Sequence, residues 1–260
     1  MRHLRAGLIL LGFVLFTLPL MPLQALLIRC WRAGAVGLPH WYHRKLAQLL
    51  GIRLRIHGRG AGAVEGPMLI VSNHVSWLDV VILSAVLPVR FVAKREVAAW
   101  PFFGALARLQ QTVFVDRERR HTTGHETSAI AKSLAAGHCV VLFPEGTSGD
   151  GRSVRNFKSS YFAAVSDVCV PIVPVTLAFS AVWGLPMTPR ELPDFAWYGD
   201  MALAPHLWKA LMAGPLTVDV VFHPPLSLDQ AKARKAAAKA CEETIRESLI
   251  AQLHQRPDVR

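Results

Sequence analysis

The sequence predicts an α/β domain with a mixed, largely parallel sheet flanked by helices, preceded by an N-terminal hydrophobic membrane anchor. Between residues 52 and 222, short apolar runs of strand length alternate with longer helical segments. Several of these runs end in polar residues, which would meet at one edge of a parallel sheet. A length of 260 residues suits one large domain, so we expect the anchor over residues 1–50 and a single domain over residues 51–260.

The N-terminal segment is strongly apolar. Residues 6–27 contain no charged side chain, and this run meets the roughly 20 residues that a membrane-spanning helix needs. Pro19 and Pro22 should kink or break a helix at that point. A single span and a kinked anchor within one leaflet both fit the pattern. A cleaved signal peptide fits less well, because Leu23 and Ala25 match a cleavage site poorly.

The positive charges of the chain accompany this apolar sequence. The formal net charge is +11, although 52% of the residues are hydrophobic. A basic and apolar composition favours an anionic membrane surface as partner and argues against nucleic acid. Arg29, Arg32 and Arg44 follow the apolar segment, so the positive-inside rule predicts that the domain lies on the cytoplasmic face of the inner membrane. Residues 41–50 read as an amphipathic helix, either interfacial or on the protein surface.

The order of the elements follows from the apolar runs. We expect strands over residues 52–57, 67–71, 89–93, 111–115, 139–143, 170–175 and 216–222. We expect helices over residues 77–87, 97–109, 121–136 and 228–255. Residues 180–211 hold three tryptophans among prolines and glycines. This segment predicts a loop-rich insertion, with its rings either near membrane or substrate or packed in the core.

His74 lies at the turn between an expected strand and an expected helix. Asp79 follows five residues later, so its carboxylate can fold back and hold one ring nitrogen, leaving the other as a base near neutral pH. A structural role fits the same residues, because Ser76 and Asp79 also form a capping box at the helix start. Taken alone, these residues leave both roles open.

Other strand ends carry charged residues that would lie near His74. Lys94, Arg117 and Glu145 each follow an apolar run, and the carboxyl ends of parallel strands share one edge of the sheet. Together they predict a site with a base and two cations. Such a site suits an anionic substrate, most simply a phosphate. Lys158 either adds a third positive charge or lies on the surface.

The sequence lacks the common motifs of metal and nucleotide chemistry. It contains no metal-ligand spacing, no P-loop and no G-x-S-x-G elbow. The four cysteines are scattered without a C-x-x-C pair, so we expect reduced, mostly buried thiols. We therefore expect neither a metal nor a cofactor.

Four sequence blocks, found in order, resemble the glycerolipid acyltransferase family, typified by 1-acyl-sn-glycerol-3-phosphate acyltransferase. The H-x4-D block spans residues 73–79, and an apolar strand closing on Asp-Arg spans residues 113–117. F-P-E-G-T spans residues 143–147, and V-P-I-V-P-V spans residues 170–175. The combination is far more specific than H-x4-D alone. The resemblance implies a phospholipid-biosynthesis enzyme that moves an acyl group from acyl-CoA or acyl carrier protein to the hydroxyl of 1-acyl-sn-glycerol-3-phosphate, forming phosphatidic acid.

The resemblance also implies roles for single residues. His74 would take the proton of the acceptor hydroxyl while Asp79 orients the imidazole. Backbone N–H groups at the helix start would hold the oxyanion, and an apolar acyl tunnel would open on the anchor side. Membrane lipids, the lysolipid acceptor and the acyl thioester are the implied partners. The implied substrate-binding residues are Asn73, Lys94, Arg117, Glu145, Gly146, Thr147 and Lys158.

Two positions depart from the family pattern. Ser148 stands where the third block commonly continues with arginine, and Gln111 where a glycine often opens the second block. The loss of one cation makes another lysolipid, such as lyso-ornithine lipid, an alternative acceptor. A non-catalytic lipid-binding protein and a lipid hydrolase are further alternatives, and the intact pair of His74 and Asp79 argues against the first.

Overall fold

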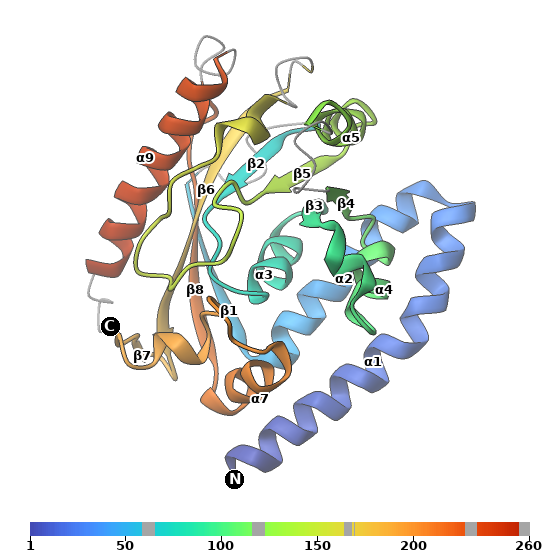
Figure 1. Ribbon diagram of the computed structural model, residues 1–260. Helices are drawn as coiled ribbons and strands as arrows, with labels where there is room; N and C mark the ends of the chain where they lie inside the picture. The colour runs from blue at the N-terminus through green and yellow to red at the C-terminus, as the bar shows by residue number, and fades with distance from the viewer. Residues whose placement is uncertain (59–65, 116–122, 164–167, 169, 227–232, 255–260) are drawn as a thin grey trace.

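Apolar strand residues form one twisted sheet with helices on both faces (Figure 1). The structure is a computed structural model that describes residues 1–58, 66–115, 123–163, 168, 170–226 and 233–254. The strands are β1 (Ile52–His57), β2 (Leu69–Ser72), β3 (Val89–Lys94), β4 (Val113–Val115), β5 (Cys139–Leu142), β6 (Ile172–Val182), β7 (Leu185–Pro186) and β8 (Leu216–Phe222). The α-helices are α1 (Arg2–Cys30), α2 (Arg32–Leu50), α3 (Leu78–Val86), α4 (Phe103–Leu109), α5 (Thr123–Ala135), α7 (Leu203–Ala213) and α9 (Arg234–His254). Short 3-10 helices are η2 (Arg95–Ala99), η3 (Ser159–Phe162) and η4 (Leu192–Asp194).

The sheet is mixed, as the sequence predicts. Its strand order is β1-β8-β6-β2-β5-β3-β4, with β7 paired to β6. Strand β6 runs antiparallel to β7 and β8, and the other described pairs are parallel. The predicted fold class, a largely parallel sheet flanked by helices, is confirmed.

Both faces of the central strands are covered. Because side chains alternate along a strand, Ile70 of β2 packs in the cluster that includes α3, whereas Leu69 and Val71 pack in the cluster that includes α5 and α9. Burial on both faces explains why β2 and β5 are almost wholly apolar. The carboxyl end of β2 is therefore a rigid point in the fold, and the His74 turn begins there.

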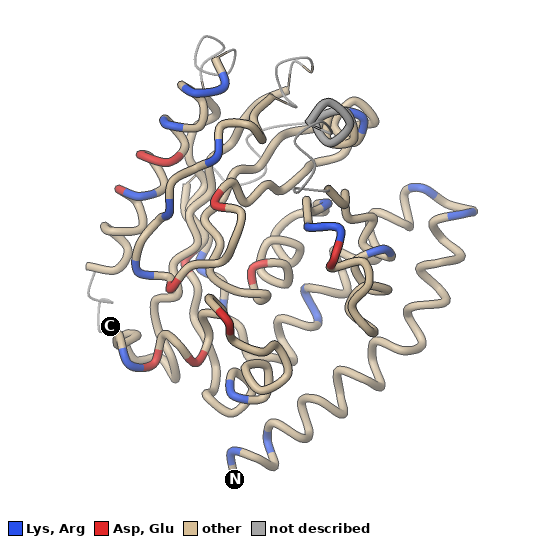
Figure 2. Tube along the Cα trace, in the orientation of Figure 1, with Lys and Arg blue, Asp and Glu red and all other residues tan. Residues whose placement is uncertain are grey.

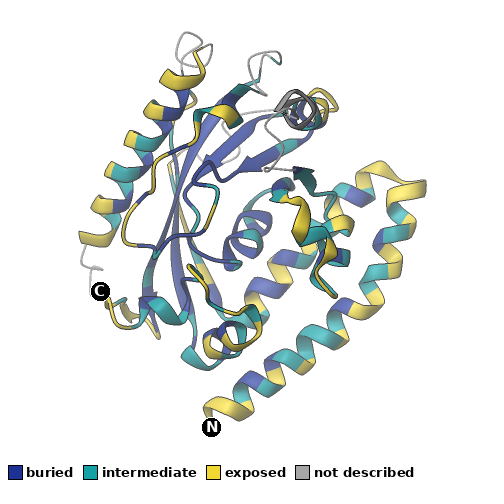
Figure 3. Cartoon of the chain, in the orientation of Figure 1, coloured by how far each residue is buried: buried dark blue, intermediate teal, exposed yellow. Residues whose placement is uncertain are grey.

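Helices α1 and α2 lie beside one another against the α3 side of the sheet (Figures 1 and 3). Helix α1 is attached near both of its ends: Arg5 donates to the carbonyl of Leu211 at 2.9 Å, and Gln24 donates to the carbonyls of Ala35 and Leu109 at 2.9 and 3.0 Å. It is the one described helix long and apolar enough to cross a membrane. Within α2, the predicted amphipathic stretch exposes Arg44 and buries its apolar side.

Three expected elements differ in the structure. Helix α1 continues through Pro19 and Pro22, because both prolines lie on its exposed side while its other side is held by the body of the protein. The helix expected over residues 97–109 is divided into η2 and α4, because Pro101 interrupts it and Phe102 adopts φ 60°. The insertion over residues 180–211 contains the start of α7, whose proline falls in the first turn, where it is tolerated.

The cysteines are less buried than predicted. Cys241 of α9 is buried and Cys139 is half-buried, but Cys30 is exposed at the end of α1. Cys169 lies outside the described residues. The expectation of mostly buried thiols is therefore wrong for Cys30, because this residue lies at the exposed C-terminal end of α1.

Candidate active site

His74 is held by a buried carboxylate at the start of helix α3. Its Nδ1 lies 2.7 Å from Oδ2 of Asp79, which is fully buried, while the His74 side chain stays 20% exposed. The same carboxylate oxygen accepts the backbone N–H groups of Val75 and Ser76 at 2.7 and 2.9 Å. Asp79 thus fills the capping role and the orienting role together. With Nδ1–H donating to the carboxylate, Nε2 is left to act as a base.

This arrangement excludes two expected oxyanion donors. The N–H groups of Val75 and Ser76 stand at the start of the helix, where the sequence predicted donors for a developing oxyanion. Both donate to the buried carboxylate of Asp79, which also binds Nδ1 of His74. An oxyanion at this site needs donors other than these two.

The ring of His74 is fixed by stacking as well as by hydrogen bonding. It packs on Phe143 with ring centroids 4.2 Å apart and an interplanar angle of 15°. Phe143 follows β5 and in turn stacks on Phe91 of β3 at 6.3 Å. Three neighbouring strands therefore set the imidazole plane. The sequence pattern shows Phe143 as part of a motif but carries no signal for this ring contact.

Glu145 holds the main chain of His74 rather than facing a ligand. Its Oε1 accepts the His74 N–H at 2.8 Å, and its Oε2 accepts the Arg155 N–H at 3.0 Å. The side chain is buried and lies outside the lining of the cavity described below. The N–H of Gly149 donates to the His74 carbonyl at 2.8 Å. The loop after β5 therefore binds both the N–H and the carbonyl of His74. The substrate contact expected of Glu145 therefore stays a prediction, and these contacts give it no support.

Burial also changes the protonation of Glu145. Desolvation raises the pKa of this carboxyl from 4.5 to about 7, although the N–H groups of His74 and Arg155 act in the opposite direction. The group is therefore part ionised near neutral pH. Protonation would convert one acceptor oxygen into a donor that faces an N–H group.

Asn73, a second predicted substrate-binding residue, also binds the main chain in the structure. Its side-chain amide donates to the carbonyl of Leu177 at 2.9 Å and its oxygen accepts the Leu177 N–H at 2.8 Å. Asn73 is 2% exposed and does not line the cavity. Its side-chain amide joins the end of β2 to β6. Both of its polar atoms are hydrogen-bonded to the main chain of Leu177. The sequence shows the residue beside His74 but not its partner in a strand 104 residues away.

The remaining predicted residues fall into three groups. Lys94, Gly146 and Thr147 line the same cavity as His74; Gly146 has φ 78°, a conformation that favours glycine in this turn. Lys158 is exposed and outside that lining, and its backbone N–H donates to the carbonyl of Pro144 at 3.0 Å. Arg117 lies outside the described residues.

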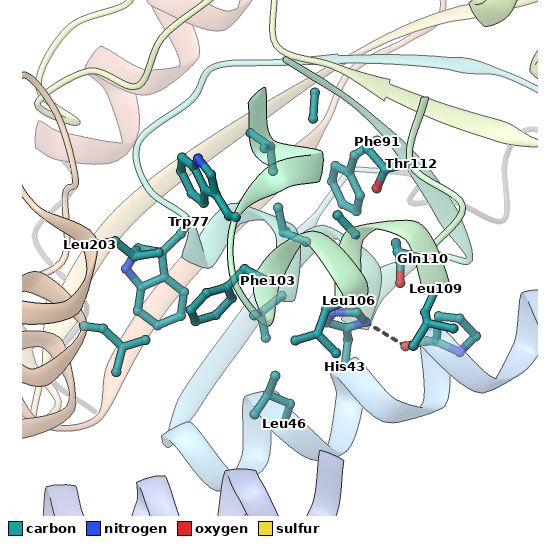
Figure 4. A pocket seen from close by; sticks show the side chains of 18 of the residues that line it. His43, Leu46, Trp77, Phe91, Phe103, Leu106, Leu109, Gln110, Thr112 and Leu203 are labelled. Atoms are coloured by element: carbon teal, nitrogen blue, oxygen red, sulfur yellow. Dashed lines mark hydrogen bonds between the residues drawn. The ribbon is translucent and has the colours of Figure 1, made fainter. Parts of the chain in front are cut away.

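His74 opens onto a long apolar cavity of about 510 Å³. Helix α1 contributes residues from Ile9 to Gln24 to its wall, a length of about 22 Å at 1.5 Å per residue. Figure 4 shows Trp77, Phe103 and Leu203 on one side of the cavity, with His43 and Gln110 farther along it. The walls come from α1, α2, α3, α4 and α7 together with β3. A space of this shape and polarity accepts an extended hydrocarbon chain.

Ser148 connects the His74 loop to the tryptophan-rich segment. Its Oγ donates to the carbonyl of Trp197, and the Trp197 N–H donates to the carbonyl of Val75 at 3.0 Å. The Trp197 ring meets Trp100 edge to face at 6.1 Å, and both rings line the cavity. The sequence left two expectations open for Trp197, a position near membrane or substrate and packing in the core. The order of residues in the chain did not reveal that Ser148 binds it.

The chain belongs to the acyltransferase family. The family pattern, described as Acyltransferase, matches residues 53–178, which carry the His74 turn and the loop after β5. Within the described residues no group of histidine, cysteine and acidic side chains is arranged to hold a metal ion.

Its relatives include proteins with two different acceptors in their names. The chain is 40% identical to the lyso-ornithine lipid O-acyltransferase of Rhizobium meliloti (strain 1021), covering 94% of this chain and 85% of that protein. It is 41% identical to the protein of that name from Brucella abortus (strain 2308), covering 94% and 93%. The 1-acyl-sn-glycerol-3-phosphate acyltransferase of Neisseria gonorrhoeae is 31% identical, covering 73% and 72%. The crystal structure of the acyltransferase PlsC from Thermotoga maritima shares the fold, with a TM-score of 0.72 at 17% identity over 98% and 95% of the two chains.

Proposed function

We propose that this membrane-associated acyltransferase transfers a fatty acyl group from an acyl thioester to the hydroxyl of lyso-ornithine lipid. The observation that carries the proposal is Ser148, which binds a backbone carbonyl where a phosphate-binding arginine is expected. The ornithine headgroup carries a carboxylate and an amine but no phosphate. Lys94, at the cavity edge, suits a single carboxylate. The names of the relatives that are about 40% identical support the same acceptor.

The chemistry follows from the imidazole geometry. Nε2 of His74 takes the proton of the acceptor hydroxyl as its oxygen attacks the thioester carbonyl, and a carbon–oxygen bond forms. The buried carboxylate of Asp79 stabilises the imidazolium and keeps the ring in one orientation. Collapse of the tetrahedral intermediate breaks the carbon–sulfur bond. The imidazolium returns its proton to the departing thiolate, so the enzyme ends in its starting state.

The second candidate acceptor is 1-acyl-sn-glycerol-3-phosphate, the acceptor that the family resemblance of the four sequence blocks implies. The Asp-Arg block with Arg117 and the names of two relatives favour it. In that case Lys94 and Arg117 would hold the phosphate and the product would be phosphatidic acid. Ser148 and the more similar relatives argue for the other order. Both acceptors use the same base and the same apolar cavity.

Helix α1 places the site within reach of membrane lipids. Leucines at spacings of three and four residues form an exposed stripe on the side that faces away from the body: Leu4, Leu8, Leu11, Leu15 and Leu18. Leu26, eight residues further on, is exposed as well. The helix is about 44 Å long at 1.5 Å per residue, longer than the roughly 30 Å hydrocarbon core. Because the body of the protein packs along it near both ends, we infer that α1 lies in the plane of one leaflet, with the domain on the cytoplasmic face.

The test is release of thiol from acyl-CoA and from acyl carrier protein by purified protein in detergent. Each donor is offered with lyso-ornithine lipid, with 1-acyl-sn-glycerol-3-phosphate and with no acceptor, beside His74→Ala. We expect release that needs lyso-ornithine lipid and is lost in the variant. Release with the phosphate acceptor alone would reverse the order of the two candidates. Release without any acceptor would identify a hydrolase, and silence throughout would favour a binding protein.

Ser148→Arg sharpens the choice of acceptor. If the serine excludes phosphate binding, arginine at this position raises kcat/KM for 1-acyl-sn-glycerol-3-phosphate relative to lyso-ornithine lipid by about tenfold, the effect of one charge-assisted contact. Ser148→Ala is the matched control, because it removes the hydroxyl contact to Trp197 without adding a charge. Both variants lose the serine hydroxyl, so a difference in activity between them isolates the effect of the guanidinium.

A further inference from the structure

The turn between β6 and β7 exposes two large apolar side chains. Trp183 is 58% exposed and Leu185 is 68% exposed. Gly184 lies between them with φ 80°, which makes the turn tight. Exposed tryptophans of this kind are typical of membrane–water interfaces, where the ring is apolar and the indole N–H is satisfied.

Trp183 is held rigidly although it faces outward. Its indole N–H donates to the carbonyl of Ala213 at 2.8 Å, and its backbone N–H donates to the carbonyl of Pro215 at 3.0 Å. Gly214 leaves the space for the ring, since a Cβ there would stand 2.2 Å from the indole nitrogen. The residue itself has φ 55°, a costly conformation for a bulky side chain. The fold therefore fixes an exposed ring at a cost in backbone strain.

This turn lies beside the N-terminal end of α1. The guanidinium of Arg5 lies 5.5 Å from the centre of the Trp183 ring. On the outer side of the same helix, Leu4 and Leu8 are 68% and 60% exposed. Figure 2 shows that the charged residues of α1 are basic and lie at its ends. Exposed leucines, a basic side chain and an exposed aromatic ring therefore occur together at the N-terminal end of α1, and the helix contains no acidic residue.

We propose that the β6–β7 turn is a second membrane contact, with Trp183 and Leu185 entering the headgroup layer of the leaflet that holds α1. The occupant is a phospholipid bilayer, because Arg5 joins this turn to the end of α1 on which Leu4 and Leu8 are exposed. Basic side chains at that end of the helix (Figure 2) suit anionic headgroups. The turn and the helix then fix the tilt of the protein on the membrane. The inference rests on the membrane association of α1 but not on the choice of acceptor.

The test places a fluorophore on the turn of the full-length protein reconstituted on vesicles of phosphatidylcholine and phosphatidylglycerol. Leu185→Cys is labelled in a Cys30→Ser background, which removes the exposed native thiol. The matched control is Ile250→Cys, because Ile250 lies in α9 and is 49% exposed. The same background without an added cysteine measures labelling of the remaining thiols.

We expect the label at position 185 to be quenched by brominated lipids and protected from aqueous iodide, and the label at position 250 to show the reverse. Equal quenching by iodide at both positions, with no effect of brominated lipid at position 185, would overturn the proposal. Leu185→Asn gives a second readout, a loss of vesicle affinity of roughly fivefold, the effect of withdrawing part of one apolar side chain. Acyl transfer in detergent micelles should be unchanged by Leu185→Asn. A failure of the proposed function would instead appear as absent acyl transfer by the wild type, whatever the result for vesicle affinity.

Discussion

The start of helix α3 and the loop after β5 each offer a buried carboxylate to His74, and they act on different parts of it. Asp79 binds the imidazole, together with two N–H groups of its own helix start. Glu145 binds the His74 main chain from a loop 71 residues away. In the proposed mechanism, Asp79 stabilises the charge that forms on the imidazole during the reaction, and Glu145 fixes the position from which the ring acts.

Asp79→Asn should have the largest effect. The amide carries no charge to stabilise the imidazolium, although its oxygen can still accept the three N–H groups that Oδ2 accepts now. We therefore expect kcat to fall by about 10³–10⁴-fold, as for a triad aspartate. KM for both substrates should change little. The measurement is steady-state thiol release, with circular dichroism to show that the variant is folded. A folded variant with near wild-type kcat would remove Asp79 from the mechanism.

Glu145→Gln should reduce kcat by roughly 10–100-fold, because a small misplacement of the base is costly. Glutamine keeps one acceptor oxygen but presents an NH2 group to the second N–H donor. Since the side chain lies outside the cavity lining, KM for the acceptor should stay within about twofold of wild type. A raised acceptor KM with an unchanged kcat would instead restore the substrate-binding role that the sequence motif suggests.

The pH dependence distinguishes the two carboxylates further. Because the pKa of Glu145 is raised to about 7, the ionised form that accepts both N–H groups is lost as pH falls through 7, and kcat should decline with it. Stability should move the other way. A folded-state pKa above the unfolded value stabilises the folded protein at low pH. This stabilisation from Glu145 is therefore lost as the pH rises from 4.5 to 7. The measurements are kcat and chemical denaturation across pH 5–8 for wild type and for Glu145→Gln. Identical pH profiles for the two proteins would contradict both expectations.

Asn73→Ala should mainly affect stability. It leaves the buried N–H and C=O of Leu177 without partners, which costs about 2–4 kcal/mol of unfolding free energy. At temperatures where the variant is folded, KM for both substrates should match wild type. Urea unfolding and steady-state kinetics on the same preparation check both parts. A raised KM with unchanged stability would show that Asn73 contacts substrate after all.

The sequence predicts the sheet, its mixed direction and the position of His74 well, because these depend on local hydrophobic alternation and on turns. The roles of Asn73 and Glu145 could not be predicted in the same way. Their partners are backbone groups of Leu177 and Arg155, and a motif identifies a residue type without identifying what it binds. The cavity was expected on the anchor side, but its walls depend on how α1, α4 and α7 pack, which no local pattern specifies.

Helix α1 separates two apolar environments, since residues from Ile9 to Gln24 line the cavity while its leucines face outward. With this helix in a leaflet, acyl chains reach His74 sideways from the lipid and never cross water. Turnover should then follow the mole fraction of substrate in the surface rather than its bulk concentration. Dilution of the lysolipid with inert lipid should lower the rate at a fixed total amount of substrate. The concentration that governs the rate is then the amount of substrate per membrane area.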